Sequence, residues 1–369
     1  MSSPENPLTS SSIEQELALH RKEINRLDAE IVQLLNERIR HALGIGEIKI
    51  RNGQEIYAPH RERDVFDRVK SLNQGPMKDE SLCAIYREVM SAALSLQKTL
   101  VVAYLGPEAT FTHQAALKRF GTSLTYIPQR TVADVFTEVG KGRADYGVAP
   151  VENSTEGIVN NTLDMLVDTH LKIVAQIMMP IRQCLIGRCR RDQVKRVYSH
   201  PQALAQCRFW IQRSLSHVEI METSSTARAA ELTSKDPEGA ALASSMAAET
   251  YDLDILEDNV QDSQANYTRF LVLGRQCPPR TGKDRSSLMI SVPDRVGSLF
   301  KALEPFTRHK VNMTRIESRP NKRKAWEYYF FLDIEGHTED TEVALAIDEL
   351  EHLGAYVKIL GSYPESEWL

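Results

Sequence analysis

The sequence predicts a multidomain chain of class α + α/β + α+β. Residues 13–98 carry apolar residues at helical spacing and show no strand-like alternation, which indicates an all-helical domain. From residue 100 onward a unit of buried strand, Ser/Thr/Asn turn and helix recurs, as is typical of α/β folds. Residues 287–360 then follow the order strand, helix, strand, strand, helix, strand, which indicates a small α+β domain.

Composition describes several ordinary globular domains. The chain has 369 residues, of which 42% are hydrophobic, and a net charge of −5, which argues against a nucleic-acid or membrane-surface role. No stretch approaches the roughly twenty apolar residues that a membrane span needs. Residues 1–12 are polar and serine-rich, as expected of a disordered tail and not of a secretion or transit signal. Five cysteines without a C-x-x-C pair are expected to be reduced thiols in a cytoplasmic protein.

Residues 13–51 are predicted to form one long helix. Its apolar residues recur at three- and four-residue steps, as in a seam that packs against other helices, and they are Ile24, Leu27, Ile31, Leu34, Ile45 and Ile48. Arg38 takes the next seam position after Leu34, and Lys49 returns to within about 20° of it at roughly 100° per residue. Two cations on a face that should be dry indicate an anion beside them. The alternative is that Arg38 extends its guanidinium into solvent.

Arg21 adds a third cation to the same helix. It lies about 26 Å from Arg38 along the axis, too far to reach the same small ligand within one chain. A second copy of the helix, running antiparallel, would bring Arg21 to that ligand. The stretch is therefore predicted to be half of a dianion site that another protomer completes.

Two further helices are predicted in this domain, one beginning just after Pro59 and one over residues 79–97. Arg61 and Glu62 open the first of these helices, and Gln97 ends the second. Polar side chains at these ends can cap a ligand that lies beside the cations of the long helix.

The α/β region places hydroxyl-bearing turns after successive strands. These turns are 110–112 after the strand 100–105, 152–155 after 146–150, 199–202 after 196–198, and 223–226 after 218–220. Each opens a helix, whose N-terminus favours negative charge. Together they predict an α/β cleft for an anionic small molecule, although any one of them is equally explained as a helix cap. The last strand, 267–273, begins with Thr268 and Arg269, and residues 277–285 have the composition of a linker.

The C-terminal order is that of a ferredoxin-like βαββαβ unit of about 80 residues, a fold that by itself implies no function. The chain contains no P-loop, no G-x-G-x-x-G after a strand, no H-E-x-x-H and no G-x-S-x-G. Its ten histidines show no metal-ligand spacing. A reaction on a carboxylated small molecule without metal or cofactor fits what remains.

In this order, the domains resemble the bifunctional chorismate mutase–prephenate dehydratase family of bacterial phenylalanine biosynthesis. The resemblance covers essentially the whole chain after about residue 13 and rests on separate motifs: Tyr104-Leu-Gly-Pro, Pro150-Val-Glu-Asn-Ser, Tyr198-Ser-His-Pro-Gln, Thr268-Arg-Phe and Glu317-Ser-Arg-Pro. It implies an isomerase that rearranges chorismate to prephenate and a lyase that decarboxylates and dehydrates prephenate to phenylpyruvate. The implied domains are a mutase over 13–98, a dehydratase over 99–276, and an ACT regulatory domain over 286–365 after the linker.

In the mutase, the resemblance implies an intertwined dimer whose long first helix spans two active sites. The residues that match the family's substrate-binding positions are Arg21, Arg38, Lys49, Arg61, Glu62 and Gln97. Arg38 and Arg21 of the partner subunit would clamp the two carboxylates, supported by Arg61. Glu62 and Lys49 would hold the ring hydroxyl. Lys49 and Gln97 would donate to the ether oxygen, which gains charge as the C–O bond breaks.

The dehydratase is expected to have two α/β lobes, like a periplasmic binding protein, with its site between them. Thr268 matches the family's catalytic threonine, which would protonate or hydrogen-bond the departing hydroxyl. Arg269 would hold a substrate carboxylate or order the site. The remaining polar residues implied in substrate binding are Glu152, Asn153 and Gln206.

The ACT domain is implied to bind L-phenylalanine at a dimer interface and to close the dehydratase cleft as allosteric feedback inhibition. The implied effector-binding residues are Gly297, Ser298, Leu299, Asn312, Glu317, Ser318, Arg319 and Pro320. Three positions differ from the usual family pattern: Ala58 replaces an aspartate, Ala93 replaces a serine, and Ser298 replaces an alanine.

Two other functions are considered. One is a monofunctional dehydratase whose helical domain only dimerises, and the intact set of mutase residues argues against it. The other is a non-catalytic amino-acid sensor, which needs neither the Thr268-Arg-Phe motif nor a charged helical site. No cofactor is expected, and a homo-oligomer at least as large as a dimer is.

Overall fold

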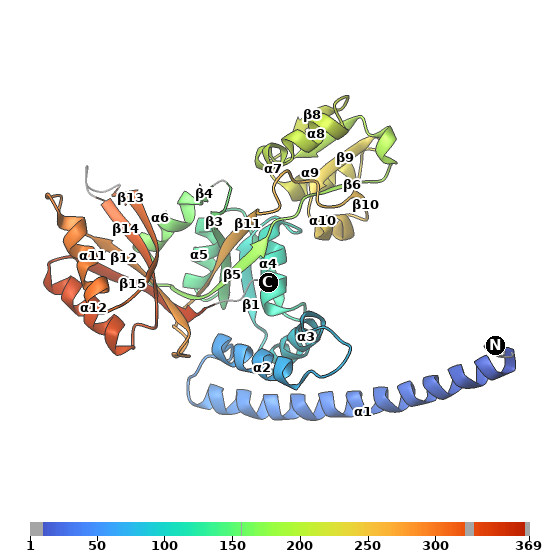
Figure 1. Cartoon of the computed structure of the whole chain (residues 1–369), viewed down its shortest axis with the longest axis horizontal. Helices are drawn as coiled ribbons and strands as arrows, with labels where there is room; N and C mark the ends of the chain where they lie inside the picture. Colours follow the sequence, from blue (N-terminus) through green and yellow to red (C-terminus); the bar gives the residue numbers. More distant parts are fainter. Residues whose placement is uncertain (1–9, 156, 322–327, 366–369) are drawn as a thin grey trace, which may run out of the picture.

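The computed structural model describes residues 10–155, 157–321 and 328–365, and it divides into three parts in chain order (Figure 1). A helical part is followed by a two-lobed α/β part and then by a sheet with helices on one side. The predicted fold class is confirmed. Most of the predicted tail, residues 1–9, lies outside the described residues, and the first helix begins at Ser10. Within the described ranges, no helix combines the length and apolarity needed to cross a membrane.

The helical part consists of α1 (Ser10–Arg51), α2 (Pro59–Leu72) and α3 (Asp79–Gln97). Pro59 starts α2, where a missing N–H costs nothing, and Asp79 and Glu80 open α3, where negative charge suits the helix dipole. Both predicted starts are confirmed. Helix α1 extends far beyond its two neighbours, which lie over its C-terminal half (Figure 1).

The predicted apolar seam of α1 does not pack within one chain. Ile31 is 52% exposed and Leu34 is 63% exposed, and the other seam residues are exposed as well. The less exposed stripe of α1 is displaced around the helix from this seam and includes Arg38, Gly46 and Lys49. The predicted packing of this seam against other helices is therefore not found within one chain, where neither α2 nor α3 covers it.

The first α/β lobe is built on a sheet with the strand order β2-β1-β3-β11-β5, to which β4 is added beside β3. Strand β1 is parallel to β2 and β3, whereas β11 is antiparallel to both β3 and β5. The strands are β1 (Val101–Leu105), β2 (Thr125–Gln129), β3 (Tyr146–Asn153), β4 (Gly157–Ile158), β5 (Lys172–Pro180) and β11 (Tyr267–Gly274), and the helices are α4 (Phe111–Phe120), α5 (Val132–Gly140) and α6 (Asn160–Asp168).

The second lobe has the strand order β10-β6-β9-β7-β8. Its strands are β6 (Cys184–Gly187), β7 (Arg196–Ser199), β8 (Glu219–Glu222), β9 (Gly239–Ala243) and β10 (Asp254–Glu257), and its helices are α7 (Pro201–Gln206), α8 (Arg208–Ser214), α9 (Thr226–Thr233) and α10 (Ser245–Thr250). Two connections join the lobes, one from β5 to β6 and one from β10 to β11 (Figure 1). Strand β11 therefore returns to the middle of the first sheet after the second lobe is complete.

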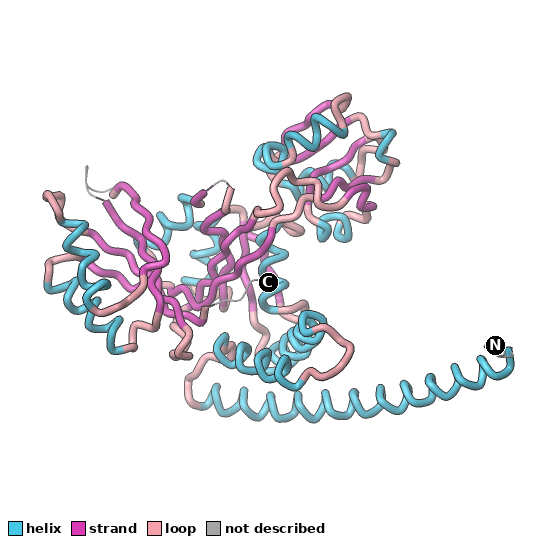
Figure 2. Tube along the Cα trace, in the orientation of Figure 1, coloured by secondary structure: helices cyan, strands magenta, loops and turns pink. Residues whose placement is uncertain are grey.

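The C-terminal part has the predicted βαββαβ order and an antiparallel sheet ordered β13-β14-β12-β15 (Figure 2). Its elements are β12 (Asp284–Ser291), α11 (Ser298–Arg308), β13 (Met313–Pro320), β14 (Tyr328–Glu335), α12 (Thr341–His352) and β15 (Tyr356–Pro364). The predicted linker 277–285 overlaps the first residues of β12. The apolar pattern of the sequence also predicts that the third strand of this part begins at Trp326, which lies outside the described residues.

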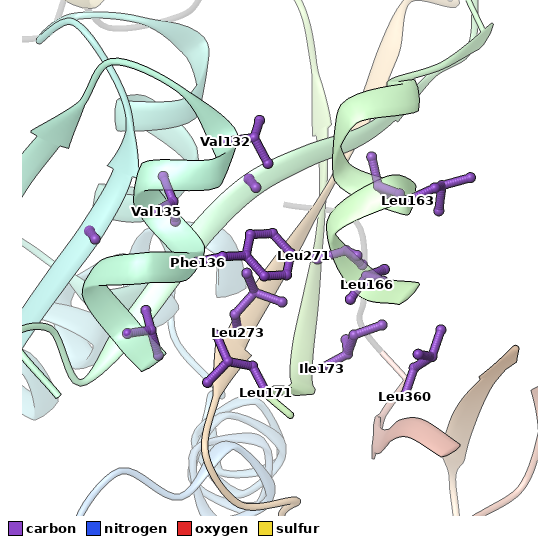
Figure 3. Packing of buried hydrophobic residues seen from close by; sticks show 14 of the residues in the cluster. Val132, Val135, Phe136, Leu163, Leu166, Leu171, Ile173, Leu271, Leu273 and Leu360 are labelled. Carbon is purple, nitrogen blue, oxygen red and sulfur yellow. The ribbon is translucent and has the colours of Figure 1, made fainter. Parts of the chain in front are cut away.

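The first lobe and the C-terminal part share one hydrophobic core. Leu163 and Ile173 of the lobe belong to the same buried cluster as Phe331 and Leu360, and Figure 3 shows Leu360 next to Ile173. Strand β15 approaches so closely that a Cβ on Gly361 would lie 2.1 Å from the backbone oxygen of Ile173. Only glycine permits this approach, so the backbones of β15 and β5 are in direct contact here, with no room for a side chain at position 361.

Candidate functional site

The first candidate site lies where β3 and β11 run side by side. Thr268 and Asn153 are register partners, and Asn153 Nδ2 donates to Thr268 Oγ1 at 2.8 Å and to Asn266 Oδ1 at 2.9 Å. Both Thr268 and Asn153 are buried. Because the amide hydrogen is donated to the threonine oxygen, the threonine's own hydrogen is not used in this contact. The arrangement leaves Thr268 able to donate a hydrogen bond to a ligand.

Neighbouring groups fix the orientation of the Asn153 amide. The backbone N–H of Thr155 donates to Asn153 Oδ1 at 3.0 Å, and Thr155 Oγ1 donates to Asn266 Oδ1 at 3.1 Å. An amide whose oxygen accepts from a backbone N–H presents its NH2 group in the other direction. The contact with Thr268 is thus set by the backbone after β3. Sequence reasoning did not single out Asn266, which directly precedes β11.

Glu152 and Arg269 are register partners too, but they lie on the opposite face of the sheet, because successive strand residues alternate between faces. Glu152 Oε2 is 3.1 Å from Arg315 Nε, and Arg269 Nη1 is 2.5 Å from Asp333 Oδ2. Arg269 also donates to the hydroxyl of Tyr363 at 3.0 Å. The structure therefore does not bring these two predicted substrate ligands together with Thr268; it directs them toward the C-terminal part.

The Arg269–Asp333 pair is deeply buried, with side chains 7% and 5% exposed. Burial alone would raise the pKa of Asp333, yet the adjacent guanidinium of Arg269 outweighs burial and holds that pKa below its usual value. The pair is accordingly an ion pair at neutral pH. Sequence reasoning missed both Asp333 and Arg315; for Arg315, the available signal was its position two residues before Glu317 on the same strand face.

Gln206 ends α7 in the second lobe and contacts both connections between the lobes. Gln183, after β5, donates from Nε2 to Gln206 Oε1 at 3.4 Å, and the backbone N–H of Asp262, before β11, donates to the Gln206 carbonyl at 2.8 Å. Among the described residues, no hydrogen bond joins Gln206 to Thr268 or Asn153. The structure places Gln206 where the two lobes meet.

The second candidate site lies on the half-buried stripe of α1. The Arg38 guanidinium carbon is 5.7 Å from the ring centroid of Tyr86 on α3, a cation–π distance, so Arg38 does not simply extend into solvent. Lys49 Nζ donates to the Ile56 carbonyl at 3.0 Å, and burial lowers its pKa. Gln97 lies against Gly46, where a Cβ would come within 2.5 Å of Gln97 Oε1. Arg38 and Gln97 thus lie at the α1–α3 contact, and Lys49 lies on the same half-buried stripe of α1 beside the segment that precedes α2.

The other predicted mutase residues lie elsewhere. Arg21 is on the uncovered half of α1, and Arg61 is exposed. Glu62 is buried, with Oε2 3.1 Å from Arg119 Nη2 on α4 and accepting from the Tyr57 hydroxyl at 3.3 Å. Burial raises the pKa of Glu62. In the single chain, Glu62 therefore joins the helical part to the first lobe, a contact that no sequence pattern indicated.

The predicted effector residues lie on two elements of the C-terminal part. Gly297 precedes α11 with φ +80°, a left-handed conformation that glycine adopts without strain, and Ser298 and Leu299 begin that helix. The residues 317–320 end β13, which is an edge strand. Arg319 donates to Asn160 Oδ1 at 2.7 Å and to Asp164 Oδ1 at 2.9 Å on α6. Asn312 is exposed and donates to Glu335 at 2.9 Å.

Comparison with known families divides the chain in the same order. The profile of type II chorismate mutase matches residues 20–98, that of prephenate dehydratase matches 102–278, and that of the ACT domain matches 286–352. A protein of Aquifex aeolicus (strain VF5), described as a bifunctional chorismate mutase/prephenate dehydratase, is 49% identical over 95% of this chain and 99% of its own length.

Solved structures agree over the α/β and C-terminal parts. A prephenate dehydratase from Arthrobacter aurescens in complex with L-Phe has 33% identity and a TM-score of 0.67, covering 72% of this chain and 90% of its own. A chain described as a novel type of quorum quenching acylase has 32% identity and a TM-score of 0.67, covering 72% of this chain and 98% of its own. The near full-length relative and the three successive profiles show that the chain belongs to the family of bifunctional chorismate mutase/prephenate dehydratases.

Proposed function

We propose that the chain converts chorismate to prephenate at the helical site and prephenate to phenylpyruvate at the α/β site, as a cytoplasmic homo-oligomer that L-phenylalanine inhibits. The observation that carries the dehydratase assignment is the hydrogen bond from Asn153 to Thr268, which leaves the threonine a donor. The mutase profile and the paired cations of α1 disfavour a dehydratase with a purely dimerising helical domain. The Thr268–Asn153 pair disfavours a sensor without activity.

The dehydratase step needs a proton donor. The ring of prephenate becomes aromatic as its carboxylate leaves as carbon dioxide and its hydroxyl leaves from the opposite ring carbon. The electrons of the broken C–C bond enter the ring as the C–O bond breaks, and hydroxide leaves easily only if it is protonated to water. We assign this donation to Thr268, whose oxygen accepts from Asn153, and solvent returns a proton to Thr268 before the next turnover. Accepting that bond polarises the hydroxyl and strengthens it as a donor.

The mutase step is a rearrangement within one molecule, so the site needs only to fold the substrate and stabilise charge. Arg38 would bind a substrate carboxylate, and Lys49 and Gln97 would donate to the ether oxygen. Glu62 would hold the ring hydroxyl once its contact with Arg119 opens, and Arg61 would support the carboxylate end. The half-buried positions of Arg38 and Lys49 on α1, with Gln97 against Gly46 of the same helix, support these roles.

The second carboxylate would be bound by Arg21 of the partner subunit. In an antiparallel two-fold pair of α1 helices, the axis that places each Arg21 near the other copy's Arg38 passes close to the midpoint between them. The exposed apolar residues Ile24, Leu27, Ile31 and Leu34 lie on both sides of that midpoint. A second copy would bury them together and complete both sites.

We also propose L-phenylalanine as the effector of the C-terminal part. The loop around Gly297 is flanked by the exposed apolar residues Val296 and Phe300, which suit an aromatic amino acid or a second copy. The residues 317–320 would complete the effector site across two copies.

One assay tests the proposal as a whole. Purified protein is supplied with chorismate, and the loss of chorismate and the appearance of phenylpyruvate are followed, with and without L-phenylalanine. The proposal requires phenylpyruvate to form without any added cofactor and to form more slowly with the amino acid. Prephenate accumulating as the end product would contradict the dehydratase half.

A further inference from the structure

Strand β13 presents three charged residues toward the first lobe. Arg315, Glu317 and Arg319 occupy alternate positions, so they share one face of the strand, and this face is half-buried whereas the intervening residues are exposed. Arg315 reaches Glu152 at the end of β3, and Arg319 reaches Asn160 and Asp164 on α6. One edge strand thus contacts both β3 and α6 of the lobe.

Arg315 belongs to a compact group of two cations and two carboxylates. Its Nε is 3.1 Å from Glu152 Oε2, and its Nη1 is 4.0 Å from Asp333 Oδ2, the oxygen that also pairs with Arg269. The hydroxyl of Ser287 donates to the other Asp333 oxygen at 2.5 Å. The charges balance in a mostly buried setting. Removing any one of these four charged side chains would leave a buried charge without its partner, which lowers the stability of the folded chain.

This group holds the backbone of the candidate dehydratase site from the opposite face of the sheet. Glu152 adjoins Asn153, and Arg269 adjoins Thr268, so each residue of the site has a neighbour held in the charged group on the opposite face. The β3–β11 register is irregular next to Arg269, and a local irregularity of this kind changes the direction of nearby side chains. Displacing Glu152 or Arg269 therefore alters the Asn153–Thr268 contact.

The two edge strands of the C-terminal sheet contact the first lobe in different ways. Strand β15 is fixed by Gly361 against Ile173 and by Lys358, whose Nζ donates to the carbonyls of Leu166, Val167 and Thr169 within 3.0 Å. Strand β13 lies at the far edge and meets the lobe through side-chain ion pairs and hydrogen bonds. A change at β13 can consequently shift that strand while β15 stays in place.

We propose that Arg315 is a positioning residue of the dehydratase, which joins the effector strand β13 to the backbone that carries Asn153 and Thr268. The inference rests on the proposed function: L-phenylalanine, bound at residues 317–320, displaces β13, and Arg315 carries the displacement to Glu152. The Asn153–Thr268 contact then changes, and dehydration slows. In this role Arg315 acts through Glu152 and needs no contact with substrate or effector.

The experiment compares Arg315→Met with Arg315→Lys and with the control Arg308→Met in the full chain. Arg308 is an exposed arginine of the same part that pairs with Glu304 and Glu349, away from the first lobe. For each variant we would measure the mutase rate, the kcat and KM for prephenate, L-phenylalanine binding by calorimetry, and inhibition.

In Arg315→Met we expect the mutase rate and the L-phenylalanine affinity to be unchanged. The kcat for prephenate should be about fivefold lower at constant KM, as for loss of an interaction expressed in the transition state. Saturating L-phenylalanine should lower kcat by a factor about tenfold smaller than in the wild type, within the usual range of allosteric coupling. Arg315→Lys keeps the charge but not the forked contact, so it should restore part of the kcat and part of the inhibition. Arg308→Met should match the wild type.

Unchanged kcat and unchanged inhibition in Arg315→Met would overturn the proposal. If that variant loses its mutase rate and so fails to fold, Arg315→Lys decides, and wild-type inhibition in it overturns the proposal. A wild-type chain that forms no phenylpyruvate, or that L-phenylalanine does not inhibit, would instead refute the proposed function and the coupling with it.

Discussion

Asn153 donates an amide hydrogen to the hydroxyl oxygen of Thr268 across 2.8 Å, from the adjacent position of the neighbouring strand. This direction of donation matters, because it leaves the threonine's hydrogen available for a ligand. The candidate dehydratase chemistry thus depends on two residues that are far apart in the sequence. The strands that carry them, β3 and β11, are separated along the chain by the whole second lobe.

Replacing Thr268 tests this dependence most directly. Thr268→Ala removes the donor, and dehydratase kcat should fall by about two to four orders of magnitude, the usual contribution of a positioned acid. The mutase rate should not change, since α1 is remote from β11. Thr268→Ser keeps the hydroxyl and should retain much of the rate. Substantial phenylpyruvate formation from prephenate by Thr268→Ala would disprove the assignment.

Asn153→Asp tests the direction of the hydrogen bond. An ionised carboxylate only accepts, so Thr268 would turn its hydrogen toward residue 153 and away from the substrate. We expect kcat for prephenate to fall about a hundredfold near neutral pH, with mutase activity retained. Steady-state kinetics with prephenate measures the effect, and a kcat within a factor of about two of the wild type would show that the donation is unimportant.

Mixing two inactive variants tests the two-chain mutase site. Arg38→Ala and Arg21→Ala should each abolish the mutase and spare the dehydratase, because each removes one carboxylate ligand from every site. After the two proteins are unfolded together and refolded as an equal mixture, half of the dimers are mixed, and each mixed dimer has one intact site. About a quarter of wild-type mutase activity should return. No recovery, despite demonstrated mixed dimers, would exclude a shared site.

The pH profile of the mutase tests Gln97. A neutral amide donates at every pH, so the rate should stay within about a factor of ten between pH 5 and 8, whereas Gln97→Glu should lose activity as pH rises and the carboxyl ionises. Burial lowers the pKa of Lys49, so the wild-type rate should decline on the alkaline side earlier than an exposed lysine would allow. A tenfold fall of the wild-type rate inside that window would contradict the role of Gln97.

The Arg269–Asp333 pair predicts a pH-dependent contribution to stability. The pKa of Asp333 is lower in the folded chain than its usual value, so the contribution is complete above about pH 4, the unfolded value, and is lost as pH falls toward the folded value. Asp333→Asn leaves Arg269 buried without its anion and should cost about 3 kcal/mol at neutral pH. Urea denaturation should show this difference shrinking below about pH 4; an equal difference at both pH values would contradict the ion pair.

Periodicity and motif spacing predicted much of this architecture. Apolar spacing defined α3 over residues 79–97 and the position of β11, because local patterns determine helices and strands. The contact between Thr268 and Asn153 was not predicted, but both residues were named as site members from their motifs. What a motif supplies is the identity of a residue and its place on an element, and here it named two residues that the folded chain brings into contact.

Apolar spacing and motifs did not predict which way neighbouring side chains point or what they contact. Arg269 and Thr268 are adjacent in sequence, yet a strand sends them to opposite faces, and only the folded chain shows that one of these faces is covered by Asp333 and Tyr363. Glu62 likewise finds Arg119 across a domain boundary. Such contacts depend on how domains pack, which no periodicity within a single domain encodes.

The fit of Gly361 against Ile173 has a practical consequence for protein engineering. A chain cut at the predicted boundary after residue 276 would expose Ile173, Leu163 and Leu166, which the C-terminal part now shields. An apolar surface of this kind promotes aggregation, so deletion should yield insoluble protein and not an uninhibited dehydratase. Release from feedback control is better sought by single substitutions on β13, which leave the shared core intact.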